Sequence, residues 1–215
     1  GDRVNRLPLQ NRLMVLHQRR FDESVQVMTE VADRLIQHRR TNPLPDGRSD
    51  ILTTMLEAAD PVTGERLSDE NIRNQLVTFL IAGHETTSGL LSFAVYELLR
   101  NPEVLAEARG QVDDVLGSRL PEYEDLTSLD FLDRVLRETL RLWPTAPAFG
   151  LYPYEDTTIG GDYELSRRDT IIVLIPALHR DPEIWDDPER FDPSRFDFEK
   201  AKERPINAWK PFGNG

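Results

Sequence analysis

The chain has 215 residues, and 39% of them are hydrophobic, which is enough apolar material for a sizeable folded core. Its 38 acidic and 26 basic residues give a net charge of −12, and no basic stripe occurs, which argues against nucleic acid as a partner. The absence of cysteine excludes disulfides, zinc–thiolate sites and thiol nucleophiles within these residues. It also agrees with a reducing cytoplasm, where we expect the protein.

The first half of the chain is predicted to be helical. Apolar residues recur at helical spacing over residues 21–40, and the Pro-rich run 42–47 ends this helix. A shorter helix is expected over residues 51–58, and a long one from about Glu70 to Arg100, where no proline occurs. Because this long helix is apolar almost all round, we expect it to be buried on most faces. His84 and Glu85 in its middle argue against a membrane span, so no transmembrane segment is expected.

The second half is predicted to add two helices and a minor sheet. The helices are expected over residues 102–116 and 129–143. Three short β-branched or aromatic runs, at residues 157–159, 163–165 and 170–175, predict a small meander of antiparallel strands. The remainder, residues 181–215, has no period and is expected to be irregular. The predicted fold class is therefore mainly α with a small antiparallel β meander.

The stretch AGHETTSG, residues 82–89, places polar side chains in the middle of the long apolar helix. Gly83 weakens a helix, and mid-helix threonine and serine can bond back to the preceding turn, which would open a groove for a flat ligand. The alternative is a buried polar turn that a neighbouring helix satisfies. His84 and Glu85 also begin the zinc-protease pattern H-E-x-x-H, but Ser88 stands where the second histidine is required, which disfavours a zinc hydrolase.

The stretch RETLRLWPTAPAF, residues 137–149, combines a possible ion pair with a Pro-punctuated segment. Glu138 and Arg141 are spaced to pair on one helical face, an arrangement that by itself is most often a surface pair. Pro144 and Pro147 then favour extended chain, and the small and aromatic residues between and after them suit the wall of a pocket.

Two further motifs lie near the end of the chain. Arg195 in FDPSRF is surrounded by aromatic residues and proline, where its guanidinium could be buried against a carboxylate such as that of Glu138. The final run PFGNG predicts a tight turn, because Gly213, Asn214 and Gly215 tolerate positive φ and allow the main chain to approach another group closely.

The order of these motifs resembles the cytochrome P450 heme-thiolate monooxygenases. A-G-x-E-T-T in a long helix is followed by E-x-x-R, a Pro-punctuated aromatic segment, H-R-D, F-x-P-x-R-F and P-F-G-N-G. The resemblance runs along essentially the whole chain and covers about the C-terminal half of the family's heme domain. FLIAGHETTSGLLSFA, LRLWPTAPAF, VLIPALHRD and WKPFGNG look most like the bacterial fatty-acid hydroxylases whose heme domain is fused to a flavin reductase.

The resemblance implies a domain, an activity and a set of cofactors. Residues 1–215 would be a partial heme domain, truncated at both ends and stopping just before the cysteine loop, so that the heme-ligating cysteine is expected after Gly215. The activity would be insertion of one atom of O2 into a C–H bond of a fatty acid or similar apolar molecule, with heme b as cofactor. Electrons would come from NADPH through the FAD and FMN of a flavin reductase that this chain does not contain. The alternative is a non-catalytic helical remnant or interaction module of the same fold.

The resemblance also implies roles for individual residues. Thr86 would hold the iron-bound peroxide through its hydroxyl, and Glu85 would feed protons toward it, so both are candidate catalytic residues. The candidate heme contacts are Ala82, Gly83, Thr86, Phe212 and Gly213. The candidate substrate contacts are Ala82, Ala146, Pro147, Ala148 and Phe149. Glu138, Arg141 and Arg195 would form a buried ion cluster with a structural role, whereas His179 matches a motif position without an assigned role.

Overall fold

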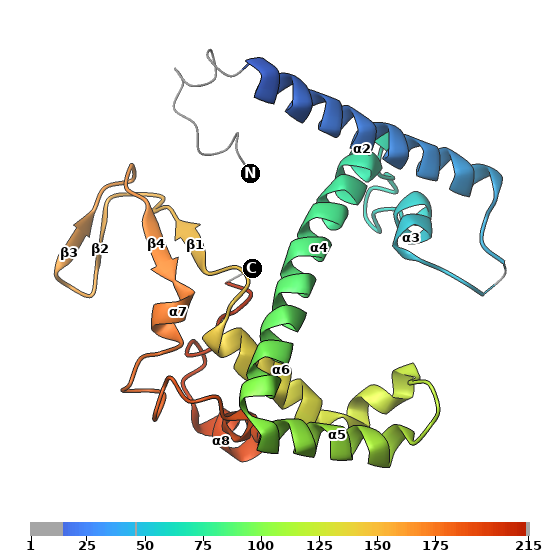
Figure 1. Cartoon of the computed structure of the whole chain (residues 1–215). Helices are drawn as coiled ribbons and strands as arrows, with labels where there is room; N and C mark the ends of the chain where they lie inside the picture. Colours follow the sequence, from blue (N-terminus) through green and yellow to red (C-terminus); the bar gives the residue numbers. More distant parts are fainter. Residues whose placement is uncertain (1–14, 46, 214–215) are drawn as a thin grey trace. The chain divides into compact units, whose positions relative to one another are not determined.

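The computed structural model describes residues 15–45 and 47–213 of the chain (Figure 1). The described residues form two compact units, which divide between His84 and Glu85. The boundary between them falls inside the long helix α4 (Asp69–Arg100), which contributes residues to both units. The turn residues Asn214 and Gly215 lie outside the described residues.

The first unit contains α2 (Val15–Thr41), α3 (Ile51–Glu57) and the first part of α4. These bounds confirm the three predicted helices, with α2 beginning at Val15 instead of Phe21. Asp50 caps α3 by accepting a hydrogen bond from the Thr53 amide at 2.8 Å, and it also pairs with Arg39 of α2. A small core of Ile36, Leu52 and Ile72 joins α2, α3 and the first part of α4.

The second unit contains the helices that the structure describes after α4. They are α5 (Pro102–Leu116), the 3-10 helix η1 (Tyr123–Ser128), α6 (Asp130–Leu142), α7 (Ile175–Leu178), the 3-10 helix η2 (Pro193–Phe196) and α8 (Phe198–Glu203). The predicted helices over residues 102–116 and 129–143 are confirmed. The segment after residue 181 is mostly irregular, as expected, apart from the short helices η2 and α8.

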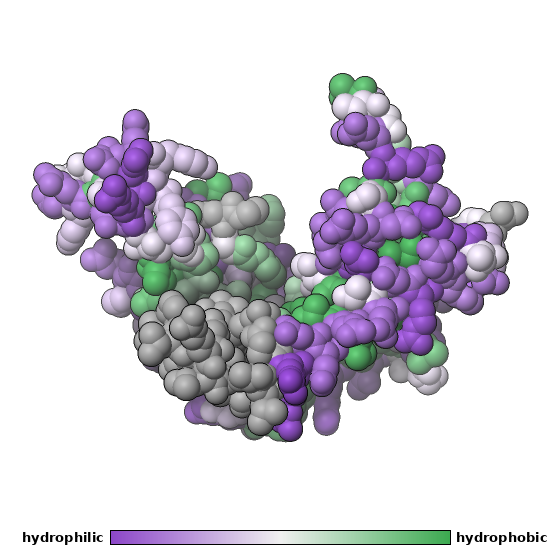
Figure 2. All heavy atoms as spheres, turned by 90° about the horizontal axis from the view of Figure 1, so that it is seen from above, coloured by the Kyte–Doolittle hydropathy of each residue, from purple (hydrophilic) through white to green (hydrophobic). Residues whose placement is uncertain are grey.

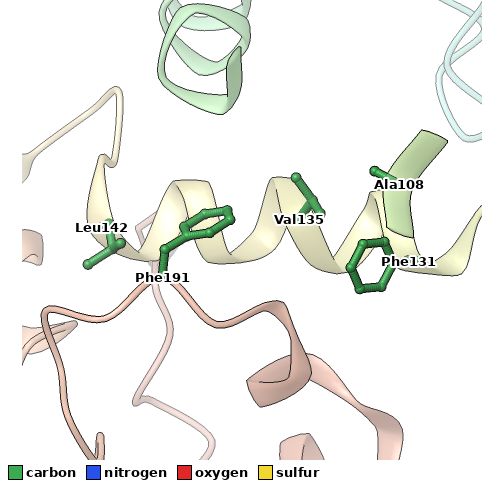
Figure 3. Packing of buried hydrophobic residues seen from close by; sticks show 5 residues of the cluster. All are labelled: Ala108, Phe131, Val135, Leu142 and Phe191. Carbon is green, nitrogen blue, oxygen red and sulfur yellow. The ribbon is translucent and has the colours of Figure 1, made fainter. Parts of the chain in front are cut away.

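The core of the second unit follows α6. Phe131, Val135 and Leu142 lie along this helix and are buried, with Ala108 of α5 and Phe191 of the C-terminal segment packed against them (Figure 3). The α6 helix is therefore the element around which α5 and the irregular segment assemble.

The strands form two separate antiparallel pairs. They are β1 (Ala148–Leu151), β2 (Thr157–Ile159), β3 (Tyr163–Leu165) and β4 (Ile171–Leu174), and they pair as β1 with β4 and β2 with β3 (Figure 1). The expected antiparallel strands are present, but the meander order is wrong, because β4 leaves the hairpin and pairs with β1. The apolar strand β1 offers β4 an apolar partner in the register Phe149 opposite Val173, which the short strand β3 does not.

The apolar residues of α4 differ from expectation, because many of them are exposed in this chain. Phe79 is 48% exposed, Leu80 62% and Leu99 69%, and Figure 2 shows hydrophobic side chains, in green, at the surface in several places. The predicted burial of this helix on most faces is therefore wrong for the 215 residues. The helix is apolar all round, and the elements packed against it cover only part of its circumference.

No helix among the described residues is both long enough and apolar enough to cross a membrane.

Candidate functional site

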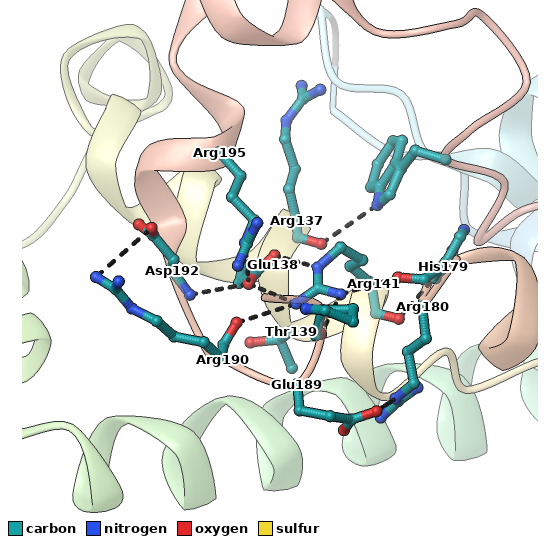
Figure 4. Close-up of polar contacts among 12 residues, drawn as sticks. Arg137, Glu138, Thr139, Arg141, His179, Arg180, Glu189, Arg190, Asp192 and Arg195 are labelled. Carbon is teal, nitrogen blue, oxygen red and sulfur yellow. Dashed lines mark hydrogen bonds and ion pairs between the residues drawn. The ribbon is translucent and has the colours of Figure 1, made fainter. Parts of the chain in front are cut away.

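Glu138 and Arg141 form a fully buried ion pair on α6 (Figure 4). The Arg141 Nε donates to Glu138 Oε2 at 2.7 Å, and Nη2 donates to Oε1 at 2.9 Å, so the pairing is bidentate. Both side chains are 0% exposed. The motif is therefore not the surface pair that its spacing alone would favour.

Arg141 also donates hydrogen bonds to main-chain carbonyls of the C-terminal segment. Its Nη1 donates to the carbonyls of His179 at 2.8 Å and Pro188 at 2.7 Å, and its Nη2 also donates to the Arg190 carbonyl at 3.1 Å. These carbonyls come from a stretch that forms turns and bends instead of a helix or strand, so side chains can supply donors to them. One guanidinium thus ties the irregular segment to α6.

Arg195 and the Asp192 amide approach Glu138 from the same segment. The Asp192 amide donates to Glu138 Oε1 at 2.8 Å, and Arg195 Nε lies 3.4 Å from that oxygen. Arg195 also donates to the carbonyls of Asp186 and Asp187. Burial raises the pKa of Glu138, whereas the hydrogen bonds from Arg141 act in the opposite direction. The structure therefore brings Glu138, Arg141 and Arg195 into one cluster.

A second buried carboxylate, which the sequence analysis did not single out, joins α4 to the end of α6. Glu97 is 5% exposed and accepts a hydrogen bond from Trp143 Nε1 at 2.8 Å. The Trp143 ring also stacks on Phe93, with ring centroids 4.9 Å apart and planes 4° from parallel. The sequence signal that could have indicated this contact is the charged Glu97 among apolar residues, one helical turn after the aromatic Phe93.

Gly89 is the glycine of the AGHETTSG stretch whose small size matters for packing among the described residues. A Cβ at Gly89 would lie 3.0 Å from Thr145 Cγ2, whereas a Cβ at Gly83 would meet nothing within 4 Å. The close approach of α4 to the Pro-rich segment after α6 therefore depends on Gly89. The expectation that Gly83 makes room for a ligand is a separate matter and stays a prediction.

The polar residues of that stretch lie exposed on one uninterrupted helix. Glu85 and Thr86 follow each other in α4, and Ser88 Oγ donates to the Glu85 carbonyl at 3.3 Å. The helix continues without a break through these residues, and the groove expected there stays a prediction. The alternative of a buried polar turn is not supported either, because residues 82–88 are exposed in the described structure. Ala82 and Gly83 belong to the first unit, and Glu85 and Thr86 belong to the second.

Gly213, a candidate heme contact, lies close to Phe149, a candidate substrate contact. Gly213 has φ +71°, as its place in a glycine turn predicts, and its amide donates to the Lys210 carbonyl at 3.1 Å. A Cβ at Gly213 would lie 3.7 Å from Phe149 Cδ1, so the turn approaches β1 closely. Phe212 is 77% exposed and packs edge-on against Trp209.

Three other candidate substrate contacts directly precede Phe149 in the chain. Ala146, Pro147 and Ala148 are exposed. The chain bends at Thr145 and Ala146 before β1 begins, so it is extended over only part of the predicted segment. These residues present a small apolar surface next to Phe149.

The turn at Phe212 and Gly213 suits an apolar cofactor such as heme, but the 215 residues contain no thiolate. Of the candidate heme contacts, Phe212 offers an exposed aromatic ring and Gly213 has no side chain, which is the kind of surface that can contact an apolar macrocycle. The sequence, however, contains no cysteine, and the described residues include no group of three or more His, Cys, Asp or Glu side chains that could hold a metal ion. The turn thus suits an apolar macrocycle, whereas the thiolate that the family resemblance implies is not among the 215 residues.

Residues 3–215 match the family described as Cytochrome P450. Among curated proteins, the chain is 52% identical over 211 residues to the bifunctional cytochrome P450/NADPH--P450 reductase 2 of Bacillus subtilis, covering 98% of this chain and 20% of that protein. It is 46% identical over 215 residues to a self-sufficient cytochrome P450 monooxygenase of Phanerodontia chrysosporium, covering 99% and 20%. The chain thus spans about one fifth of the length of these relatives.

Solved structures agree with this similarity. The crystal structure of the cytochrome P450DA heme domain is 47% identical and superimposes with a TM-score of 0.89, covering 94% of this chain and 44% of that one. A mutant of the same heme domain is 45% identical, with a TM-score of 0.90, and covers 99% and 46%.

Proposed function

The chain belongs to the cytochrome P450 family, and on that premise we propose that it is part of a heme-dependent monooxygenase that hydroxylates fatty acids. The observation that carries the proposal is the similarity, at about half identity along nearly the whole chain, to proteins that join a P450 to an NADPH–P450 reductase. The buried cluster around Glu138 and the turn at Gly213 supply a rigid scaffold of the kind such a site needs.

The proposed reaction consumes dioxygen, two electrons and two protons, and it yields a hydroxylated product and water. Heme b, when bound, would supply the activation of dioxygen, while NADPH would supply the electrons through the FAD and FMN of a fused reductase. In this chain, the Thr86 hydroxyl would hold a proton at Oγ1 and pass it inward, and the Glu85 carboxylate would resupply it. Both side chains lie on consecutive positions of α4 and reach solvent in the described structure, which is compatible with proton exchange.

The remaining candidate residues would bind the substrate or the heme, or would support the site structurally. Phe149 and the small residues Ala146 to Ala148 would line the path of an alkyl chain, because an apolar wall without hydrogen-bonding groups suits a hydrocarbon. Ala82 and Gly83 would leave room beside the heme, and Phe212 and Gly213 would also contact it. Glu138, Arg141 and Arg195 would hold the scaffold without taking part in the chemistry.

The heme ligand itself is proposed to follow the described turn. We propose a cysteine within about ten residues after Gly215 in the full-length polypeptide, because the family's metal ligand is a thiolate that such a turn approaches. The 215 residues expressed as written should then give no thiolate-type carbon monoxide difference spectrum, since they contain no cysteine.

The test is made on the full-length protein. Purified enzyme with NADPH, dioxygen and saturated fatty acids of several chain lengths should give hydroxylated acids detectable by mass spectrometry, together with a thiolate-type carbon monoxide spectrum. A normal spectrum without hydroxylated acid would refute the substrate class and keep the family activity. A continuation without cysteine, and no such spectrum, would favour the non-catalytic module instead.

A further inference from the structure

His179 joins two distant segments through its ring. It directly follows α7 and is 0% exposed. Its Nδ1 lies 3.1 Å from the Arg141 carbonyl oxygen, and its Nε2 accepts a hydrogen bond from the Lys210 amide at 2.8 Å. One imidazole therefore bridges the end of α6 and the start of the turn that ends the described chain.

These partners determine the protonation state of the ring. The Lys210 amide can only donate, so Nε2 must carry a lone pair, and the Arg141 carbonyl can only accept, so Nδ1 must carry the proton. The ring is thus the neutral tautomer with hydrogen on Nδ1. Burial favours the same state, because it lowers the pKa of His179 to about 4, and the positive charges of Arg141 and Arg180 act in the same direction.

The contact fixes the first residue of the turn at both of its main-chain groups. The Lys210 amide is held by His179, and its carbonyl accepts the Gly213 amide at 3.1 Å. Gly213 in turn lies against Phe149 at positive φ. The position of Phe212 and Gly213 therefore depends on where the imidazole places Lys210.

His179 is itself held at two points by a single residue. Arg141 donates from Nη1 to the His179 carbonyl at 2.8 Å and accepts the His179 ring proton at its own carbonyl. The Trp185 ring closes the pocket edge-on, with centroids 6.5 Å apart. The imidazole consequently has one orientation, and it transmits the position of the buried Glu138–Arg141 pair to the turn.

We propose that His179 is a positioning residue whose neutral imidazole sets the placement of the Lys210–Gly213 turn against the end of α6. The consequence for the heme rests on the proposed function: a displaced turn would displace the thiolate expected to follow it, so fewer molecules would carry the thiolate-ligated iron. The effect on the turn itself is independent of heme.

Two conservative variants separate the two ring contacts in the full-length protein. The amide of His179→Asn can replace Nδ1 and keep the bond to the Arg141 carbonyl, whereas the amide of His179→Gln reaches the position of Nε2 and can keep the acceptor for Lys210. His179→Phe removes both bonds while keeping a ring of similar size.

The first readout is hydrogen–deuterium exchange at the Lys210 amide, resolved by fragmentation mass spectrometry. We expect exchange at least about tenfold faster in His179→Asn and His179→Phe, and within about threefold of the parent in His179→Gln. Equal protection of this amide in the Asn and Gln variants would overturn the proposal, and this comparison decides the matter even if the Phe variant does not fold.

The second readout is the fraction of bound heme that gives the thiolate-type carbon monoxide spectrum. It should fall in His179→Asn and be restored in His179→Gln, a pattern that general destabilisation would not produce. An unchanged fraction in His179→Asn, in spite of faster Lys210 exchange, would overturn the link to the heme. Absence of the thiolate spectrum in the parent protein would instead refute the proposed function and leave the exchange result standing.

Discussion

Removal of the Glu138 carboxylate tests whether the cluster on α6 is a structural support of the domain. Glu138→Ala leaves Arg141 with an uncompensated buried charge, because the pair is bidentate and both side chains are 0% exposed. The Asp192 amide loses its acceptor at the same time. Breaking a buried pair from one side costs about 3–5 kcal/mol of unfolding free energy. We expect that loss in the complete heme domain, together with poor heme incorporation.

Asp133→Ala is the matched control on the same helix. Asp133 pairs with Arg137 at 2.6 Å, but the two side chains are 57% and 47% exposed. Such a pair contributes about 0–1 kcal/mol. The assay is urea unfolding of both variants alongside the heme-to-protein absorbance ratio. If Glu138→Ala loses no more stability than Asp133→Ala and keeps its heme, the reasoning about the buried cluster is refuted.

Three further predictions concern single side chains. The pKa of His179 lies near 4 in the folded protein and at 6.5 in the unfolded chain, so the unfolded chain binds more protons between these values. The neutral His179 therefore contributes up to about 3 kcal/mol of unfolding free energy, which is fully present above pH 6.5 and is lost as the pH falls toward 4. Unfolding measured across that range should show a steeper loss of stability in the parent than in His179→Gln. Thr86→Ala should keep heme and melting temperature but lower the product formed per NADPH consumed, whereas unchanged coupling with a lower melting temperature would mean that Thr86 only serves the helix. Trp143→Phe removes the indole donor to Oε1 of buried Glu97 and should cost about 1–3 kcal/mol by urea unfolding. A loss below about 0.5 kcal/mol in the same assay would show that water replaces the indole N–H.

Local structure and family were readable from the sequence alone. Helices such as residues 102–116 follow from apolar spacing bounded by proline and glycine, because these features act on the backbone over a few residues. The positive φ of Gly213 follows from the residue type in the same way. The motifs from AGHETTSG to PFGNG were enough to indicate the P450 family, since their order and spacing are independent of packing.

Tertiary structure alone decided which distant groups meet. The sequence predicts short strands at residues 157–159, 163–165 and 170–175, but not that β4 pairs with β1 across an intervening hairpin. It also does not show that His179 accepts the Lys210 amide or that Glu97 accepts the Trp143 indole. Such contacts join segments far apart in the chain, and their formation depends on how all buried polar groups find partners at once. Apolar periodicity in α4 could not show how much of that helix is covered either, because coverage is set by neighbouring elements and not by the helix itself.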